Sequence, residues 1–288
     1  MVQGSDKKGV PLTLDDVKTP PAEAVGACRV ACEPIAGVPS TFLHPPDAAM
    51  QKQIVFLHGG AFTNGPIICH WGMLARICER TRMPAVMVDY GLLPESPFPA
   101  GLNDVLNVYS ELRKKRRISE LVLMGDSAGG GLALAATLAL KDQMQSGDSP
   151  GGQAEPPGLP DKLVLLSPWL DLTLSNPEIE GIREYEQLLR KEGLIEIGRE
   201  YANGRDPAHY LLSPVNGDLA GLPPTLLLIG THDILVCDCR RFRDKARAAG
   251  IDLNYQEWEA MFHGWMTLTP QMPEANRAVE EIAGFLRR

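Results

Sequence analysis

The sequence predicts an α/β fold in which a mostly parallel β-sheet is covered by helices on both faces. The first observation is a set of continuous apolar segments, because strands buried on both faces of a sheet carry apolar residues at successive positions. The second is that segments with helical periodicity lie between these strands, which is typical of parallel sheets joined by crossover helices. The third is length, since 288 residues can bury a substantial core without disulfides or metals.

Strand-like and helical segments alternate along most of the chain. Continuous apolar runs predict buried strands at 53–58, 84–90, 120–125, 162–168 and 225–230, and further strand-like segments occupy 26–35, 40–44 and 253–260. Amphipathic or apolar helical patterns lie at 69–82, 98–116, 128–145, 233–249 and 273–287. Right-handed crossovers would place the loops that follow the strands along one edge of the sheet.

Three segments interrupt this alternation. Residues 146–160 are rich in Gly, Pro and Ser and predict a surface loop. Residues 175–215 contain a helical stretch at 176–194 with no neighbouring buried strand, so we interpret them as an inserted cap. Residues 1–23 are polar and proline-bearing, which fits a loose arm or part of a lid. We expect one domain over residues 1–288.

Charge and cysteine usage exclude several classes of function. A net charge of −8 and a pI of about 5.3 argue against nucleic acid or anionic lipid as a partner. The basic run 113–117 is interpreted as the solvated end of a helix. The six cysteines show neither CxxC nor zinc spacing, so we expect reduced thiols and no metal site. The apolar run 128–140 is too short to span a membrane. Because the N-terminal residues contain no apolar signal core, we expect a cytoplasmic protein.

Chemically active residue types stand directly after four of the predicted strands. His58-Gly59-Gly60 follows the first buried strand, and Gly125-Asp126-Ser127 follows the third. Asp233 and His263 each follow a later strand. In an open α/β sheet, sites form at the carboxyl edge of the strands, so we expect these residues to meet there.

Ser127 lies in a Gly-x-Ser-x-Gly pattern that predicts a nucleophile on a strained turn between strand and helix. The alternative is an ordinary turn residue, since the pattern alone is weak. Serine needs a base, for which His263 is the best placed histidine, and Asp233 would orient that imidazole. We assign the backbone N–H groups of Gly59, Gly60 and Ala128 as donors to the oxyanion, each contributing about 3 kcal/mol to transition-state stabilisation.

Six motifs occur in order along the chain: HGGA (58–61), DYGLLPESPFPAGLNDV (89–105), GDSAGGGLA (125–133), SPWLDLT (167–173), LPPTLLLIGTHDIL (222–235) and FHGW (262–265). With these motifs the chain resembles the hormone-sensitive-lipase-like branch of the α/β-hydrolases. The resemblance implies the order Ser-Asp-His for the triad, a sheet of about eight strands, and a helical cap from 1–23 and 175–215. It further implies an esterase for short or medium acyl chains that uses no cofactor. Dimers are common in this branch, so a homodimer stays open, although no segment marks an interface.

The sequence departs from the motifs of this branch at three places. Ala61 replaces the third glycine of HGGG, which affects the acyl pocket or one donor contact. Gly91 replaces an arginine, which removes a structural ion pair. Cys237-Asp238-Cys239 replaces an acidic pair after Asp233, and we expect both thiols to be buried.

Other residues near these motifs have structural as well as functional interpretations. The aromatic residues Phe62, Tyr90, Trp169, Phe262 and Trp265 are candidates for a substrate pocket, with core packing as an equal alternative. We interpret His58 and Asp126 as anchors of the glycine loops and His232 as structural. His44, His70 and His209 are interpreted as surface or packing residues.

The sequence therefore predicts a serine hydrolase that acts on small-molecule carboxylic esters. The same triad serves lactone or amide hydrolysis and elimination, so these reactions stay open. A ligand-binding protein on a hydrolase scaffold is a further alternative, but the complete set of Ser127, Asp233 and His263 argues against it.

Overall fold

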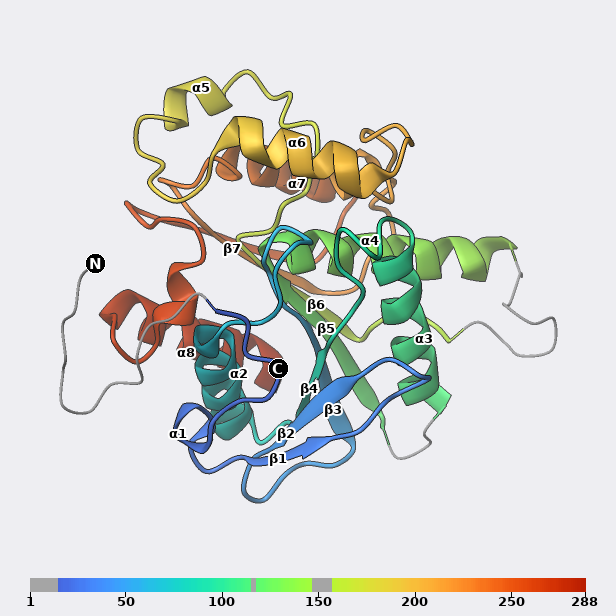
Figure 1. Ribbon diagram of the computed structural model, residues 1–288, viewed down its shortest axis with the longest axis vertical. Helices are drawn as coiled ribbons and strands as arrows, with labels where there is room; N and C mark the ends of the chain where they lie inside the picture. The colour runs from blue at the N-terminus through green and yellow to red at the C-terminus, as the bar shows by residue number, and fades with distance from the viewer. Residues whose placement is uncertain (1–14, 115–117, 147–156) are drawn as a thin grey trace.

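An eight-stranded sheet forms the centre of the computed structural model, which describes residues 15–114, 118–146 and 157–288 (Figure 1). The strand order is β1-β2-β4-β3-β5-β6-β7-β8, in which β2 pairs antiparallel with both β1 and β4 and all other pairings are parallel. The strands are β1 (Arg29–Cys32), β2 (Ser40–His44), β3 (Lys52–Leu57), β4 (Ala85–Val88), β5 (Glu120–Asp126), β6 (Lys162–Leu166), β7 (Thr225–Gly230) and β8 (Leu253–Trp258). The predicted α/β fold and its eight strands are confirmed.

Helices cover both faces of this sheet, as the alternating apolar pattern predicts. They are α1 (Ala22–Val25), α2 (Ile68–Thr81), α3 (Ala100–Lys114), α4 (Ser127–Ser146), α5 (Ile179–Ile182), α6 (Lys191–Ala202), α7 (Val236–Ala248) and α8 (Pro273–Arg287), with short 3₁₀ turns η1 (Pro214–Asn216) and η2 (Trp265–Leu268). Helices α1, α2 and α8 cover one face, and α3, α4 and α7 cover the other (Figure 1).

The core consists of two apolar layers, one on each side of the sheet. Successive residues of β5 point alternately into them: Leu121 and Leu123 join the layer under α3 and α4, whereas Val122 and Met124 join the layer under α2 and α8. Residues 128–141 of α4 are all buried, which explains why this helix lacks a polar face. The central strands and α4 therefore give the site a rigid base.

The segment 175–215 lies above the carboxyl ends of the strands, where Figure 1 shows α5 and α6 at the top of the molecule. The predicted continuous helix over 176–194 is wrong, because the chain forms a single turn at α5 and resumes helix only at Lys191. Glu186 accepts the backbone N–H groups of Leu188 and Leu189, and this turn separates the two helices. The assignment of 175–215 and 1–23 as a cap stays a prediction.

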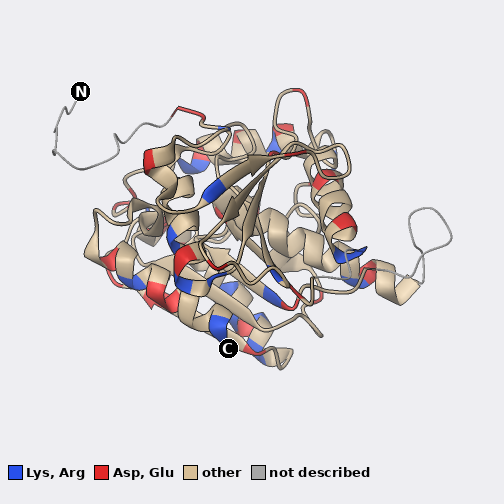
Figure 2. Cartoon of the chain, turned by 90° about the horizontal axis from the view of Figure 1, so that it is seen from below, with Lys and Arg blue, Asp and Glu red and all other residues tan. Residues whose placement is uncertain are grey.

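Parts of three predictions lie outside the described residues: the arm at 1–14, the basic residues 115–117 and the loop at 147–156. Lys and Arg are interspersed with Asp and Glu over the described helices (Figure 2). Within the described ranges, no helix has the length and apolarity needed to cross a membrane, and no three His, Cys, Asp or Glu side chains are grouped to hold a metal ion. The cytoplasmic location stays a prediction.

Candidate active site

Ser127 stands on a strained turn between β5 and α4. Its φ of 53° lies in the left-handed region, which costs a non-glycine residue about 1 kcal/mol or more. A Cβ on Gly129 would lie 2.1 Å from the carbonyl oxygen of Leu57, and one on Gly125 would lie 2.3 Å from the carbonyl oxygen of Gly129. The two glycines of the motif are therefore required by close backbone approach, and the predicted strained turn is confirmed.

A continuous hydrogen-bonded chain joins Ser127 to His263 and Asp233. Nε2 of His263 lies 2.9 Å from Oγ of Ser127, and Nδ1 of His263 lies 2.7 Å from Oδ2 of Asp233. Because a carboxylate only accepts, Nδ1 carries the proton and Nε2 is free to accept from the serine hydroxyl. The structure thus brings together the three residues that the sequence predicts.

The environment of His263 favours its charged form. Asp233 is fully buried, and the side chain of His263 is 13% exposed. Burial opposes the charge on His263, but the negative charge and the hydrogen bond of Asp233 outweigh burial and raise the pKa of His263 above its ordinary value. The imidazole is therefore a stronger base than a free histidine.

The loop that carries His263 packs directly against the end of β7. The N–H of Ala260 donates to Oγ1 of Thr231, and the N–H of His232 donates to the carbonyl oxygen of Met261. Gly230 permits this approach, since a Cβ there would lie 2.0 Å from the carbonyl oxygen of Met261. These contacts fix the distance between the turns that carry Asp233 and His263.

The glycine loop after β3 presents free backbone donors beside Ser127, but they are not all the predicted ones. Gly59 is wrong as a donor, because its N–H already donates to Oδ1 of Asp126 at 2.8 Å. The N–H groups of Gly60 and Ala61 have no acceptor among the described residues. Gly60 and Ala61 both have positive φ, at 118° and 53°, which explains why glycine is favoured at these positions.

Comparison with known proteins identifies the family of the chain. Residues 54–267 match the family model of the α/β-hydrolase fold. An esterase of Acinetobacter venetianus is 34% identical over 240 residues, which cover 82% of this chain and 75% of that protein. The chain belongs to the α/β-hydrolase family.

Further relatives place the hydrolase in the hormone-sensitive-lipase-like branch. An acetyl-hydrolase of Streptomyces hygroscopicus is 35% identical over 237 residues, covering 82% of this chain and 75% of that protein. The crystal structure of an esterase from the bacterial hormone-sensitive lipase family matches with a TM-score of 0.83 at 33% identity, covering 91% of this chain and 84% of that chain. The resemblance drawn from the motifs is confirmed, and the hydrolase is an enzyme of the esterase class.

Asp126 anchors the oxyanion loop, as predicted, and it does so with a partner that the sequence did not reveal. Its Oδ2 lies 3.1 Å from Nε2 of His70, whose Nδ1 accepts the N–H of Ile67. Since Nδ1 accepts, Nε2 carries the proton, and His70 donates to Asp126 as a neutral imidazole. The surface alternative for His70 is therefore wrong, whereas its packing is confirmed, because it is buried beside the rings of Phe56 and His58. No spacing motif links it to Asp126.

His58 supports the glycine loop through its buried imidazole ring. Its Nδ1 lies 2.7 Å from the carbonyl oxygen of Gly59, and its ring stacks on Tyr90 at a centroid distance of 4.6 Å. The hydroxyl of Tyr90 donates to the carbonyl oxygen of His58. Burial lowers the pKa of His58 to about 4, so this imidazole is neutral. The predicted structural role of His58 is confirmed.

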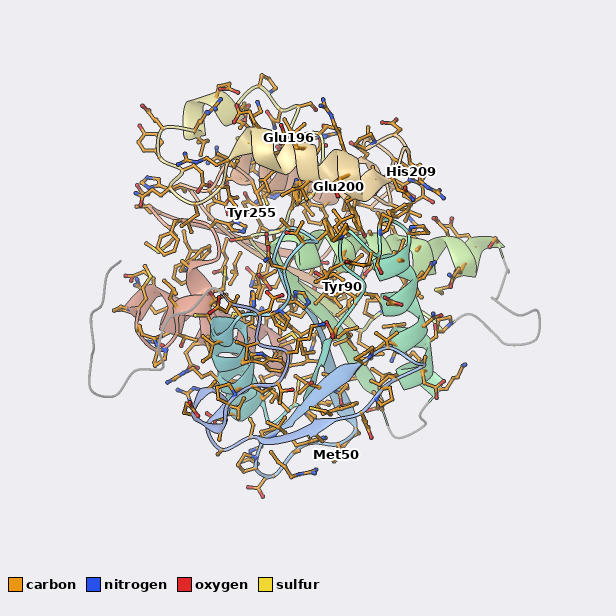
Figure 3. All side chains as sticks on the ribbon, in the orientation of Figure 1. Met50, Tyr90, Glu196, Glu200, His209 and Tyr255 are labelled. Atoms are coloured by element: carbon orange, nitrogen blue, oxygen red, sulfur yellow. The ribbon has the colours of Figure 1, made fainter. Side chains whose placement is uncertain are left out.

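Most of the aromatic pocket candidates belong to the core of the hydrolase. Tyr90 and Trp169 are each 1% exposed, and Figure 3 places Tyr90 in the interior below α6. Trp265 is fully buried in the layer under α2 and α8. These three are wrong as pocket walls, because they offer no surface to a ligand. Phe62 is 4% exposed and stacks on Tyr201 of α6, whereas Phe262 is half-buried and stays a pocket candidate.

The departures from the branch motifs are accommodated locally. At Gly91, the backbone N–H donates to Oδ2 of Asp104, so this carboxylate has a donor without an arginine. Cys237 and Cys239 are buried, as predicted, and burial raises the pKa of both thiols. Burial and the nearby Asp171 raise the pKa of Asp238 to about 7.

Proposed function

We propose that the hydrolase cleaves carboxylic esters of short to medium acyl chains through Ser127, His263 and Asp233. The observation that carries this proposal is the hydrogen-bonded chain from the serine hydroxyl through the imidazole to a buried carboxylate, with distances of 2.9 and 2.7 Å. The relative named as an acetyl-hydrolase favours the short end of the acyl range.

In the acylation step, Oγ of Ser127 attacks the ester carbonyl while Nε2 of His263 takes the hydroxyl proton. Asp233 stabilises the resulting imidazolium and holds its tautomer. The tetrahedral oxyanion accepts hydrogen bonds from the N–H groups of Gly60, Ala61 and Ala128, the last at the start of α4, where helical N–H groups lack intrahelical partners. His263 then gives its proton to the leaving alkoxide.

In the deacylation step, water attacks the acyl-enzyme ester on Ser127. Nε2 of His263 takes a proton from this water and returns it to Oγ of Ser127 when the carboxylic acid leaves. Because only neutral His263 can act as the base, the rate should rise with pH through the raised pKa of this residue, above the ordinary histidine value of about 6.5.

The test is hydrolysis of p-nitrophenyl acetate, butyrate and octanoate by the wild type and by Ser127→Ala. We expect the variant to lose at least about a thousandfold in kcat, and a fluorophosphonate probe to label only the wild type. Ser119→Ala is the matched control, because Ser119 lies near the amino end of β5, away from the site. Full activity in Ser127→Ala would exclude the mechanism, and faster turnover of lactones or amides than of esters would change the substrate class.

A further inference from the structure

Residues 175–215, called the cap segment below, contact the turn that carries Asp233 through a buried carboxylate. Oε2 of Glu186 accepts the N–H of Ile234 at 3.1 Å, and Ile234 directly follows the triad acid. Oδ1 of Asp233 accepts the N–H of Leu235 in the same turn. Hydrogen bonds within the turn therefore hold Asp233, and the loop between α5 and α6 adds a contact to the residue that follows it.

Glu186 is unusual because it is buried and has no cationic partner. The residue is 7% exposed, and no ion pair joins it to a Lys, Arg or His of the described chain. Three backbone N–H groups, those of Leu188, Leu189 and Ile234, satisfy its two oxygens instead. Burying a carboxylate is unfavourable unless donors satisfy it, so these three N–H groups are what allows Glu186 to be buried beside the Asp233 turn.

The negative charge of Glu186 acts on His263. The groups that influence this imidazole come from four elements: Ser127 at the start of α4, Asp126 at the end of β5, Asp233 in the β7–α7 turn and Glu186 in the cap segment. Of these, Ser127 and Asp233 contact the ring directly. Glu186 adds to Asp233 in raising the pKa of His263, although burial acts in the opposite direction.

We propose that Glu186 is a positioning residue of the catalytic machinery: its carboxylate holds the Asp233 turn through the N–H of Ile234 and adds a second negative charge behind the imidazole. This inference rests on the proposed function of Ser127, His263 and Asp233. The charge of Glu186 stabilises the His263 imidazolium that forms as Ser127 attacks. With a neutral group of similar size at position 186, Asp233 would be the main counter-charge of this imidazolium.

A second contact in the same loop provides a matched control. Tyr185 stacks on His232 at a centroid distance of 5.0 Å, so it also joins the cap segment to the Asp233 turn. It is 47% exposed and makes this contact without a carboxylate. Tyr185→Ala therefore removes packing between the same two loops while leaving the Glu186 charge in place.

Glu186→Gln removes the charge and places an amide NH₂ where one of the three backbone donors needs an acceptor. With p-nitrophenyl butyrate, we expect kcat to fall by about tenfold to a hundredfold with little change in KM. We also expect the acidic limb of the kcat/KM profile to move to lower pH, because the pKa of His263 falls. Tyr185→Ala should leave this limb at its wild-type position.

Glu186→Asp provides a second variant that retains the charge but withdraws the carboxylate by one methylene. We expect Glu186→Asp to lower kcat while keeping the acidic limb of the kcat/KM profile near that of the wild type. If Glu186→Gln loses its cooperative thermal melt, Glu186→Asp provides the test of the proposal. Two results would overturn the proposal. One is a Glu186→Gln variant with an unmoved acidic limb and a kcat within twofold of wild type. The other is a Glu186→Asp variant with the wild-type kcat. Ser127→Ala assayed in parallel separates this result from failure of the proposed function, which would require Ser127→Ala to stay active.

Discussion

The two sides of the active site are each held by one buried carboxylate, but these carboxylates come from different parts of the molecule. On the oxyanion side, Asp126 ends β5 and accepts from the N–H of Gly59 and from Nε2 of His70. On the acid–base side, Glu186 comes from the loop between α5 and α6 and accepts the N–H of Ile234.

This difference indicates that the two sides depend on different parts of the fold. The oxyanion side is built from β3, β5 and α2, which belong to the sheet and to one of its covering layers. The acid–base side is complete only when a surface segment packs on the Asp233 turn, and the neighbour of Glu186 in that segment, Tyr185, is 47% exposed. We therefore expect substitutions on the oxyanion side to lower stability and activity together, and those on the cap side to affect mainly the rate.

Alanine at two glycines should give the largest difference between the two sides. In Gly129→Ala, the Cβ would lie 2.1 Å from the carbonyl oxygen of Leu57, and this backbone cannot move aside without disturbing β3. We expect the free energy of unfolding to fall by at least about 3 kcal/mol, with loss of ester hydrolysis. Urea denaturation and a p-nitrophenyl ester assay measure both quantities.

Gly181→Ala is the cap-side counterpart, because no atom lies within 4 Å of a Cβ at this position of α5. Alanine favours a helix over glycine by up to about 1 kcal/mol, so this variant should be as stable as the wild type or slightly more stable. Similar losses of stability in both variants would contradict the distinction between the two sides.

Asp126→Asn should give the next largest effect. An asparagine cannot accept from both Gly59 and His70, so one buried donor loses its partner and the oxyanion loop is released. We expect a loss of about 1–3 kcal/mol in stability and about a hundredfold in kcat/KM. Chemical denaturation and steady-state kinetics at pH 7 provide the measurements.

The stability difference between wild type and Asp126→Asn should also depend on pH. Burial opposes the charge on Asp126, but the electrostatic attraction and hydrogen bond of His70, together with the N–H of Gly59, outweigh it and lower the pKa of this carboxyl. Its contribution is therefore present above the ordinary carboxyl pKa of about 3.9 and is lost as the pH falls through the lowered value. Asp218→Asn is the control, since its side chain is 74% exposed and its pairing with Lys141 contributes at most about 1 kcal/mol. An equal loss of stability in Asp126→Asn and Asp218→Asn would contradict a larger contribution from the buried carboxylate.

Two tyrosine hydroxyls should give the smallest difference. The hydroxyl of Tyr90 donates to the carbonyl oxygen of His58 under the oxyanion loop, whereas the buried hydroxyl of Tyr201, on α6, has no partner among the described residues. We expect Tyr90→Phe to lose about 1–2 kcal/mol and Tyr201→Phe to stay within about 0.5 kcal/mol of the wild type. Thermal melts of both variants make the comparison, and a larger loss in Tyr201→Phe would reverse it.

The sequence predicted the sheet, its covering helices and the meeting of Ser127, Asp233 and His263 because each is encoded locally. Continuous apolar runs identify the buried strands, and the residues after those strands share one edge of the sheet. The broken helix at 176–194 was missed because its interruption depends on Glu186, whose carboxylate accepts N–H groups two and three residues later.

Residues that act through distant partners could not be found in this way. The link from His70 to Asp126 joins positions 56 residues apart, and the N–H of Gly59 is withdrawn from catalysis by an acceptor 67 residues away. The aromatic candidates failed for a similar reason: proximity to a motif does not say on which side of the sheet a ring packs, and Trp265 packs on the side of α2 and α8.

The hydrogen bond from Ile234 to Glu186 also constrains protein engineering. Exchanging the segment 175–215 between related esterases is an obvious route to new substrate preference, because this segment lies over the strand ends (Figure 1). In this hydrolase such a graft would also remove an acceptor from the residue next to the triad acid. A chimera that retains a carboxylate at position 186 would keep the contact to the Asp233 turn, whereas one without it would alter the triad acid's surroundings as well as the exchanged segment.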